Sequence, residues 1–124
     1  MTDWTINELE AIDKADDLKI APFHDDLKTT GTPVWIWEVV VDNQLYVRAY
    51  GGTASRWYQS AIKQQRGKII AAGKTQTVGF EAVKDTAILD KIDNAYRRKY
   101  GTSPFMAPMI SARARAATVR IVKA

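Results

Sequence analysis

The stretch YGGTASRWYQSA, residues 50–61, contains the residue types that bind an anion. Gly51 and Gly52 would let a ligand approach the backbone closely, and Ser55 and Arg56 stand where a helix is expected to begin. Free amide groups at a helix start attract anions, and an arginine fork donates hydrogen bonds to phosphate oxygens. The spacing matches neither a dinucleotide-binding loop nor a Walker loop, however, and a glycine pair before a helix is more often purely structural. The stretch predicts either a phosphate site or a strand-to-helix turn.

A second group of candidate residues lies in VWIWEVVVDNQLYVRAY, residues 34–50. Two runs of β-branched and aromatic residues around Asp42-Asn43-Gln44 predict a β-hairpin. Because side chains alternate between the faces of a strand, one face of this hairpin is aliphatic with a single glutamate. That face carries Val34, Ile36, Glu38, Val40, Leu45, Val47 and Ala49. The opposite, aromatic face carries Trp35, Trp37, Val39, Val41, Tyr46, Arg48 and Tyr50.

The aromatic face is too apolar to remain bare in water, since exposed patches of this kind mark a ligand, a partner or a covering helix. Arg48 could stack on a neighbouring ring or hold an anion that itself stacks on the rings. Alternatively, a helix of the same chain covers this face and a carboxylate pairs with Arg48. Both alternatives remain open from the sequence. The residues expected to form a ligand or dimer face are Trp35, Trp37, Tyr46 and Tyr50.

Glu38 is the only carboxylate expected inside the sheet, where burial would raise its pKa and an acid role becomes conceivable. A buried pair with an arginine is the commoner explanation. Arg113 and Arg115 would supply that arginine if the last strand begins early. If MISARARAA, residues 109–117, is instead a helical turn, both arginines point to solvent.

Other chemistries have weaker support in the sequence. His24, Asp25 and Asp26 are potential metal ligands, but adjacent residues rarely converge on one ion and the chain has one histidine, so we expect no metal site. The absence of cysteine excludes disulfides, thiolate metal sites and a cysteine nucleophile. A serine hydrolase is not expected, because none of the candidate serines stands in a nucleophile elbow. These are Ser55, Ser60, Ser103 and Ser111.

The elements that must position these residues follow from capping signals and periodicity. Thr5 and Glu8 form a capping box for a first helix, and Asp85 caps a long helix that ends at Gly101. A further helix is predicted at about 55–66, and strands at 18–23, 34–41, 45–50, 67–72, 74–84 and 117–123. The order predicts an α+β fold with flanking helices. Its six antiparallel strands are expected to curl into a split β-barrel.

Composition and charge restrict the class of protein. We expect residues 1–124 to form a single split-barrel-like domain, since this length and a hydrophobic content of 46% suit one core. Neither a signal peptide nor a membrane span is visible, and the lack of cysteine suits a reducing compartment, so a cytoplasmic location is expected. The net charge is +4, and basic residues are concentrated in the last third of the chain. A solvated surface explains it better than nucleic-acid binding, because no run of five like charges occurs.

The hairpin, the Gly-Gly loop and the following Trp57-Tyr58 pair together resemble the flavin-binding split-barrel proteins, in particular the deazaflavin-dependent nitroreductase-like branch. Over residues 5–122 the chain is similar to an uncharacterised bacterial family of single-domain proteins. That similarity is carried by TPVWIWEVVVD, LYVRAYGG, SRWYQSA and ARAATVRI. The segment before the hairpin departs from the deazaflavin branch, whose basic motif is only faintly matched by residues 28–31.

The resemblance implies a homodimeric split barrel in which flavin mononucleotide or a deazaflavin lies between protomers. The implied cofactor-binding residues are Arg48, Gly51, Gly52, Thr53, Ser55, Arg56 and Trp57. Two functions follow as hypotheses. The first is a flavin- or deazaflavin-binding oxidoreductase that acts on a small molecule, with the cofactor supplying the hydride chemistry. The second is a cofactor-free dimeric module that binds a small ligand, or only the partner subunit, on the aromatic face.

Overall fold

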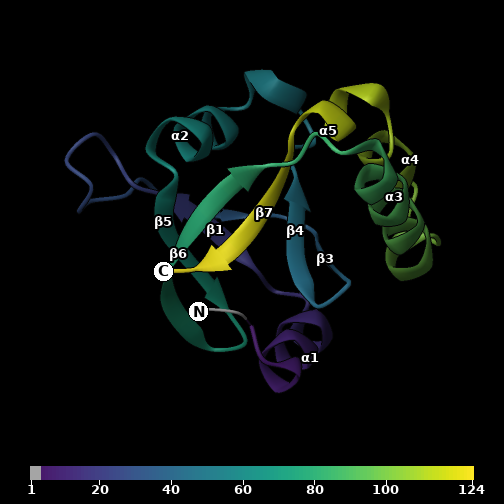
Figure 1. The fold of residues 1–124 in the computed structure, drawn as a ribbon, viewed down its shortest axis with the longest axis horizontal. Helices are drawn as coiled ribbons and strands as arrows, with labels where there is room; N and C mark the ends of the chain where they lie inside the picture. Colours follow the sequence, from purple (N-terminus) through teal and green to yellow (C-terminus); the bar gives the residue numbers. More distant parts are fainter. Residues whose placement is uncertain (1–3) are drawn as a thin grey trace.

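The structure is a computed structural model that describes residues 4–124. Its strands form one antiparallel sheet in the order β2–β1–β5–β6–β7–β4–β3, and the sheet is strongly curled (Figure 1). The strands are β1 (Lys19–Pro22), β2 (Val34–Trp35), β3 (Glu38–Val41), β4 (Gln44–Arg48), β5 (Arg66–Ala71), β6 (Lys74–Ala82) and β7 (Thr118–Lys123). The predicted α+β class and curled antiparallel sheet are confirmed.

The prediction of six strands was wrong, because the run 34–41 divides into two strands and the sheet has seven. Its first half, β2, pairs with β1, whereas its second half, β3, pairs with β4. Ile36 and Trp37 connect the halves. Since β2 and β3 are the two edges of the sheet, this short connection brings the edges together. We call the place where they meet the seam.

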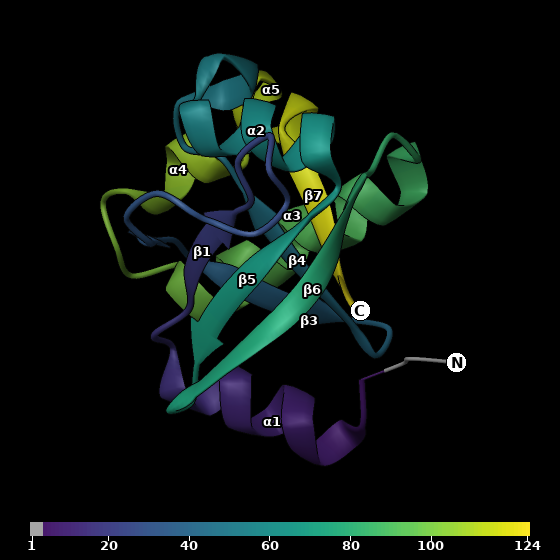
Figure 2. The ribbon, with the colours of Figure 1, turned by 90° about the vertical axis from the view of Figure 1, so that its left-hand side faces the viewer.

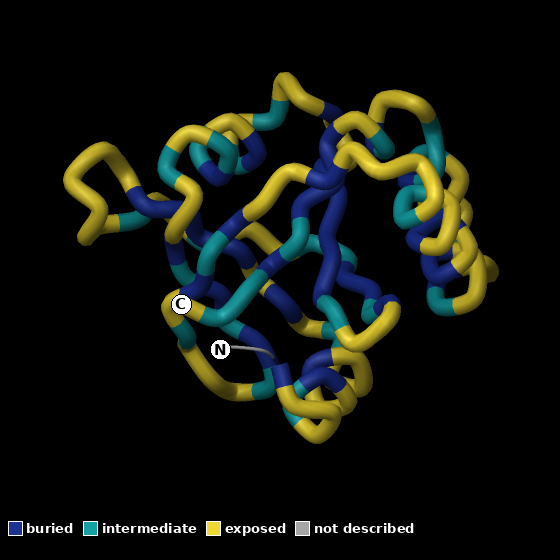
Figure 3. Tube along the Cα trace, viewed as in Figure 1, coloured by how far each residue is buried: buried dark blue, intermediate teal, exposed yellow. Residues whose placement is uncertain are grey.

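The interior of the curled sheet holds the larger apolar core. The aliphatic side of β4 faces it through Leu45 and Val47, and β1, β5 and β7 contribute Ile20, Ile69 and Ile121. Helix α1 (Ile6–Ala15) closes the lower end of the sheet (Figure 2) and adds Leu9 and Ile12, and Trp4 beside it donates a 2.8 Å hydrogen bond to the Ile121 carbonyl. The predicted capping box of Thr5 and Glu8 is present. Figure 3 shows the resulting band of buried residues along the strands.

Helix α3 (Thr86–Tyr100) covers the outer face of β3 and β4, where a second core forms. The hairpin register pairs Glu38 with Val47 and Val39 with Tyr46, so the predicted division into two faces is confirmed for β3 and β4. Val39, Val41 and Tyr46 therefore pack under the helix. Of the two alternatives for the aromatic face, the covering helix holds over this part.

The remaining helices lie at the upper end of the sheet. A 3₁₀ turn, η1 (Gly52–Ala54), leads into α2 (Arg56–Gln64), which confirms the predicted second helix. Two short helices, α4 (Met106–Met109) and α5 (Ala112–Ala116), precede β7. Helix α4 was not predicted. For MISARARAA the sequence left an early strand and a helical turn open; α5 shows that the helical turn is correct, and β7 begins at Thr118.

Candidate functional site

An apolar cavity of about 500 Å³ opens at the seam. It is lined by the strand connection, the end of β4, the Gly-Gly loop and the segment around α4. The lining residues are Val34, Trp35, Ile36, Trp37, Arg48, Tyr50, Gly51, Ser55, Trp57, Phe105 and Met109. A volume of this size suits a small ring-containing molecule. We call this space the seam cavity.

The seam cavity joins most of the site residues singled out in the sequence. Arg48, Gly51, Ser55 and Trp57 from the Gly-Gly region line it together with Trp35, Trp37 and Tyr50 from the hairpin. Gly52, Thr53, Arg56 and Tyr46 do not line it, and Tyr46 is buried under α3. Sequence reasoning missed Phe105 and Met109, which lie in a proline-containing segment without periodicity. It also placed Val34 and Ile36 on the interior face, because strict alternation does not foresee the break after Trp35.

The aromatic rings of the cavity differ in how firmly they are held. Trp37 is half-buried and stacks on Tyr100, with 4.1 Å between ring centroids and 2° between planes. Trp35, Tyr50 and Phe105 are 61%, 48% and 60% exposed and form the rim. The back wall is thus fixed by stacking, whereas the rim presents uncovered apolar rings to solvent.

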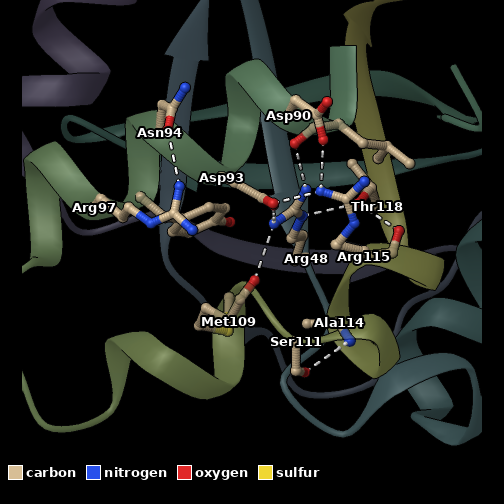
Figure 4. Close-up of polar contacts among 12 residues, drawn as sticks. Arg48, Asp90, Asp93, Asn94, Arg97, Met109, Ser111, Ala114, Arg115 and Thr118 are labelled. Atoms are coloured by element: carbon tan, nitrogen blue, oxygen red, sulfur yellow. Dashed lines mark hydrogen bonds and ion pairs between the residues drawn. The ribbon is translucent and has the colours of Figure 1, made fainter. Parts of the chain in front are cut away.

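Arg48 is fully buried, and each of its three side-chain nitrogens donates to the protein (Figure 4). Its Nε donates to the Thr118 hydroxyl at 2.9 Å, and one terminal nitrogen donates to Asp93 at 2.5 Å and to the Met109 carbonyl at 3.0 Å. The other terminal nitrogen donates to the Leu89 carbonyl at 3.1 Å. Arg48 is therefore the carboxylate-paired arginine of the second alternative. It supports the cavity wall through Met109.

The carboxylate of Asp93 is shared between two arginines. It pairs with Arg48 and also with Arg115 of α5, which in turn contacts Asp90 at 3.1 Å. These four residues join β4, α3 and α5 into one ion-pair cluster, shown in Figure 4. The expectation that Arg115 points to solvent in a helical turn was wrong, because α5 directs it towards α3.

The Gly-Gly loop is constrained by a neighbour that the sequence did not indicate. Gly52 has φ +78°, and a Cβ at this position would lie 2.4 Å from the Cγ of Arg113. Glycine is thus required both by the backbone and by the arginine stem packed over it. Ser55 stands at the N-cap of α2, but its side chain makes no capping hydrogen bond. The loop therefore both leads into α2 and provides the surface on which the Arg113 side chain packs.

A second cavity of about 350 Å³ adjoins the seam cavity and shares Val34 and Trp57 with it. Arg56 and His24 line this adjoining cavity. Within residues 4–124, Arg56 makes no ion pair with a carboxylate. A cation that no carboxylate of the described chain neutralises therefore lies next to the seam cavity.

Glu38 pairs with a lysine rather than with the arginine expected from the sequence. Its carboxylate is fully buried and accepts from Lys99 Nζ at 2.7 Å, while its other oxygen has no partner in the described chain. Burial raises the pKa of Glu38 to about 8, and the nearby Asp16 and Asp13 act in the same direction against Lys99. Tyr100, which stacks on Trp37, donates a 2.5 Å hydrogen bond to Asp16. This cluster lies beside the back wall of the seam cavity.

Other charged residues serve the fold. Asp26 accepts three hydrogen bonds from residues 28 and 29 in its own loop, and Asp25 pairs with Lys63. Over residues 4–124 no group of three or more potential metal ligands was found. In the basic C-terminal third, Arg120 pairs with Glu81 and Lys123 with Glu8. No helix in the described part of the chain is long and apolar enough to cross a membrane.

A family model with the description "Uncharacterized protein conserved in bacteria (DUF2255)" matches residues 8–121. The chain belongs to this family. A search of curated proteins found no match. The resemblance to an uncharacterised bacterial family is thereby confirmed.

Two solved structures share the fold. A conserved hypothetical protein, Rv2991 from Mycobacterium tuberculosis, has a TM-score of 0.63 at 13% identity, covering 98% of this chain and 80% of that one. A putative pyridoxamine 5'-phosphate oxidase from Listeria innocua has a TM-score of 0.62 at 7% identity, covering 92% and 86%. At these identities the likeness concerns the fold alone.

Proposed function

We propose that the seam cavity binds a flat, ring-containing small molecule, and that this molecule is flavin mononucleotide or a deazaflavin used in an oxidoreductase reaction. The observation that carries the proposal is the lining of the cavity. Rings from Trp35, Trp37, Trp57, Tyr50 and Phe105 surround a space of about 500 Å³. Aromatic side chains bind planar rings by stacking, and the rim rings are already exposed for contact.

Two groups of residues fit the two parts of such a ligand, its ring and its anionic end. The apolar walls suit the ring, and the start of α2 with Arg56 suits an anionic end. No side chain caps the first amides of α2, and Arg56 has no carboxylate partner within residues 4–124; such amides and arginines are groups that bind phosphate. Arg48 is proposed as a positioning residue, since its guanidinium is already used by Thr118, Asp93 and two carbonyl groups.

The division of labour follows from the side chains available. A bound flavin or deazaflavin would supply the hydride transfer. The chain would hold and orient the ring, keep water away from one side of it through Trp37 and Met109, and leave the rim open for a substrate. The likeness of fold to a putative pyridoxamine 5'-phosphate oxidase supports a cofactor of this class.

We also propose that the chain forms a homodimer over the rim. Val34, Trp35, Tyr50 and Phe105 are 41–61% exposed around one opening. A second copy seated there would remove these side chains from water and close the site.

The alternative is a cofactor-free dimeric module that binds a small aromatic or apolar ligand. It is favoured by the fact that Arg48, the cationic residue in the cavity lining, is fully engaged with protein groups. Such a module would accept neutral rings as readily as phosphorylated ones.

Titration of the purified protein with flavin mononucleotide and with a deazaflavin, followed by tryptophan fluorescence, tests the proposal. Saturable quenching at micromolar concentration is expected, because Trp35, Trp37 and Trp57 line the cavity. Arg56→Gln should weaken binding, whereas Arg97→Gln, an exposed arginine that bonds to Asn94, should not. Absence of quenching by both cofactors would contradict the oxidoreductase and favour the cofactor-free module.

A further inference from the structure

The arginines around the upper end of the sheet differ in whether a carboxylate neutralises them. Arg48 and Arg115 share Asp93, and Arg115 also contacts Asp90. Arg113, two residues before Arg115 on α5, makes no ion pair and no side-chain hydrogen bond within residues 4–124. Its positive charge is therefore not compensated by the described chain.

The stem of Arg113 is held in a defined place. Its Cγ and Cδ lie 2.4 Å and 3.2 Å from where a Cβ of Gly52 would be, so they pack directly on the glycine backbone. Gly52 is itself fixed, because its amide donates to the Ala49 carbonyl at 2.9 Å. The backbone of Arg113 is held as well, because the hydroxyl of Ser111 accepts a hydrogen bond from the Ala114 amide and caps the start of α5. A surface arginine with a free stem would lose more rotamer entropy on binding an anion than this seated one.

Packing of the Arg113 stem on Gly52 places its guanidinium next to Tyr50, a residue at the rim of the seam cavity. The Arg113 guanidinium carbon lies 5.9 Å from the centroid of the Tyr50 ring, which is cation–π distance. Tyr50 and Gly51 both line the cavity, and Gly52 follows them directly. The loop 51–55 thus has at each end an arginine that pairs with no carboxylate of residues 4–124: Arg113 over Gly52, and Arg56 after Ser55.

We propose that Arg113 is a specificity-determining residue that recognises an anionic group, a phosphate or a carboxylate, on a ligand whose ring occupies the seam cavity. This rests on the proposed function in so far as a ring-containing ligand binds there. The chemistry follows from the guanidinium fork, which binds planar or tetrahedral oxyanions through paired hydrogen bonds. Charge-assisted bonds of this kind have a strength that corresponds to about tenfold or more in affinity.

The test compares ligand pairs that differ in charge. Flavin mononucleotide and riboflavin share a ring and differ in the phosphate; 8-anilinonaphthalene-1-sulfonate and N-phenyl-1-naphthylamine form a second anionic and neutral pair. Affinities are measured for the wild type and for Arg113→Gln, Arg113→Lys and Arg56→Gln. Arg113→Gln should weaken the anionic member of a pair about tenfold or more and leave the neutral member within twofold, with partial recovery in Arg113→Lys.

Several results would overturn the proposal. Equal weakening of both members of a pair would make Arg113 a support for Tyr50 only, and no effect on either would remove it from the site. Charge selectivity lost in Arg56→Gln alone would assign the anion to Arg56. If neither flavin binds but the naphthalene pair shows the charge selectivity, the cofactor assignment fails while the role of Arg113 stands. Binding of none of the four probes would contradict both.

Discussion

The two ends of the aromatic hairpin face have similar residues, but one end is buried under a helix and the other is exposed to solvent. At one end, Tyr46 and Arg48 lie under α3, and Asp93 of that helix neutralises the arginine. At the other end, Trp35 and Tyr50 are exposed around a cavity, and Arg113, which lies over the ring of Tyr50, has no carboxylate partner in the described chain. Aromatic rings with an arginine therefore become core where a helix supplies cover and a carboxylate. They become a candidate site where neither is supplied.

The covered end should be the more costly to disturb. Asp93→Asn removes the charge that Arg48 and Arg115 share, and leaves a fully buried guanidinium unpaired. We expect a loss of about 3–5 kcal/mol in the free energy of unfolding, measured by urea denaturation. Asp90→Asn is the matched control, because that carboxylate is mostly exposed, and it should cost less than about 1 kcal/mol. Equal effects would contradict the buried cluster.

Glu38, on the interior side of β3, should make the stability of the covered end depend on pH. Its folded pKa of about 8 lies above the ordinary value of 4.5, so between these values the folded chain keeps a proton that the unfolded chain has released. Stability from this group is complete below about pH 4.5 and falls as the pH rises towards 8, by roughly 5 kcal/mol. Denaturation of Glu38→Gln across this range should show a flatter profile than the wild type. Parallel profiles would rule out the retained proton.

Substitution of Gly52 tests whether the Arg113 stem packs on the loop at the open end. Gly52→Ala should cost about 2 kcal/mol, because the left-handed backbone disfavours a Cβ and the Arg113 stem fills its space. Gly73→Ala is the control: its φ of +77° is nearly the same, but no atom lies within 4 Å of the added Cβ. It should cost about 1 kcal/mol. The double variant Gly52→Ala/Arg113→Ala should recover the difference in thermal denaturation; no recovery would mean that Arg113 does not press on the loop.

Trp35 should have the smallest effect on stability. It is 61% exposed, so Trp35→Ala should change the free energy of unfolding by less than about 0.5 kcal/mol. The same change should weaken a ring-containing ligand about tenfold by removing a stacking wall of the cavity. A large loss of stability together with unchanged affinity would place Trp35 in the fold rather than in the site.

Much of the fold followed from short-range signals. Thr5, Asp85 and the hairpin turn at residues 42–44 carry local chemistry that fixes the ends of elements, and the alternation along β3 and β4 correctly separated two faces. The division of residues 34–41 could not be foreseen, because both halves have the composition of a strand and only the closing of the sheet assigns them to different partners.

The candidate site was harder to predict than the fold. Of the aromatic residues singled out in the sequence, Trp35, Trp37, Tyr50 and Trp57 line the seam cavity, and Gly51 represents the Gly-Gly loop there. Phe105 and Met109 were not predicted, because they come from the end of the chain and reach the cavity only through long-range packing. Arg113 was considered only as a partner for Glu38, whereas in the structure it lies 5.9 Å from the ring of Tyr50. The partner of Glu38 was misassigned for the same reason: Lys99 lies 61 residues away, on a helix whose orientation the sequence does not reveal.

The four tryptophans allow the central claim, that the open end of the aromatic face binds a ring, to be tested most directly. Each indole gives one N–H signal in a ¹H–¹⁵N NMR spectrum, recorded with and without flavin mononucleotide. The signals of Trp35, Trp37 and Trp57 should shift, whereas that of Trp4, which is buried and bonded to Ile121, should stay. Unchanged signals for the three cavity tryptophans, or a shift of Trp4 alone, would contradict the claim.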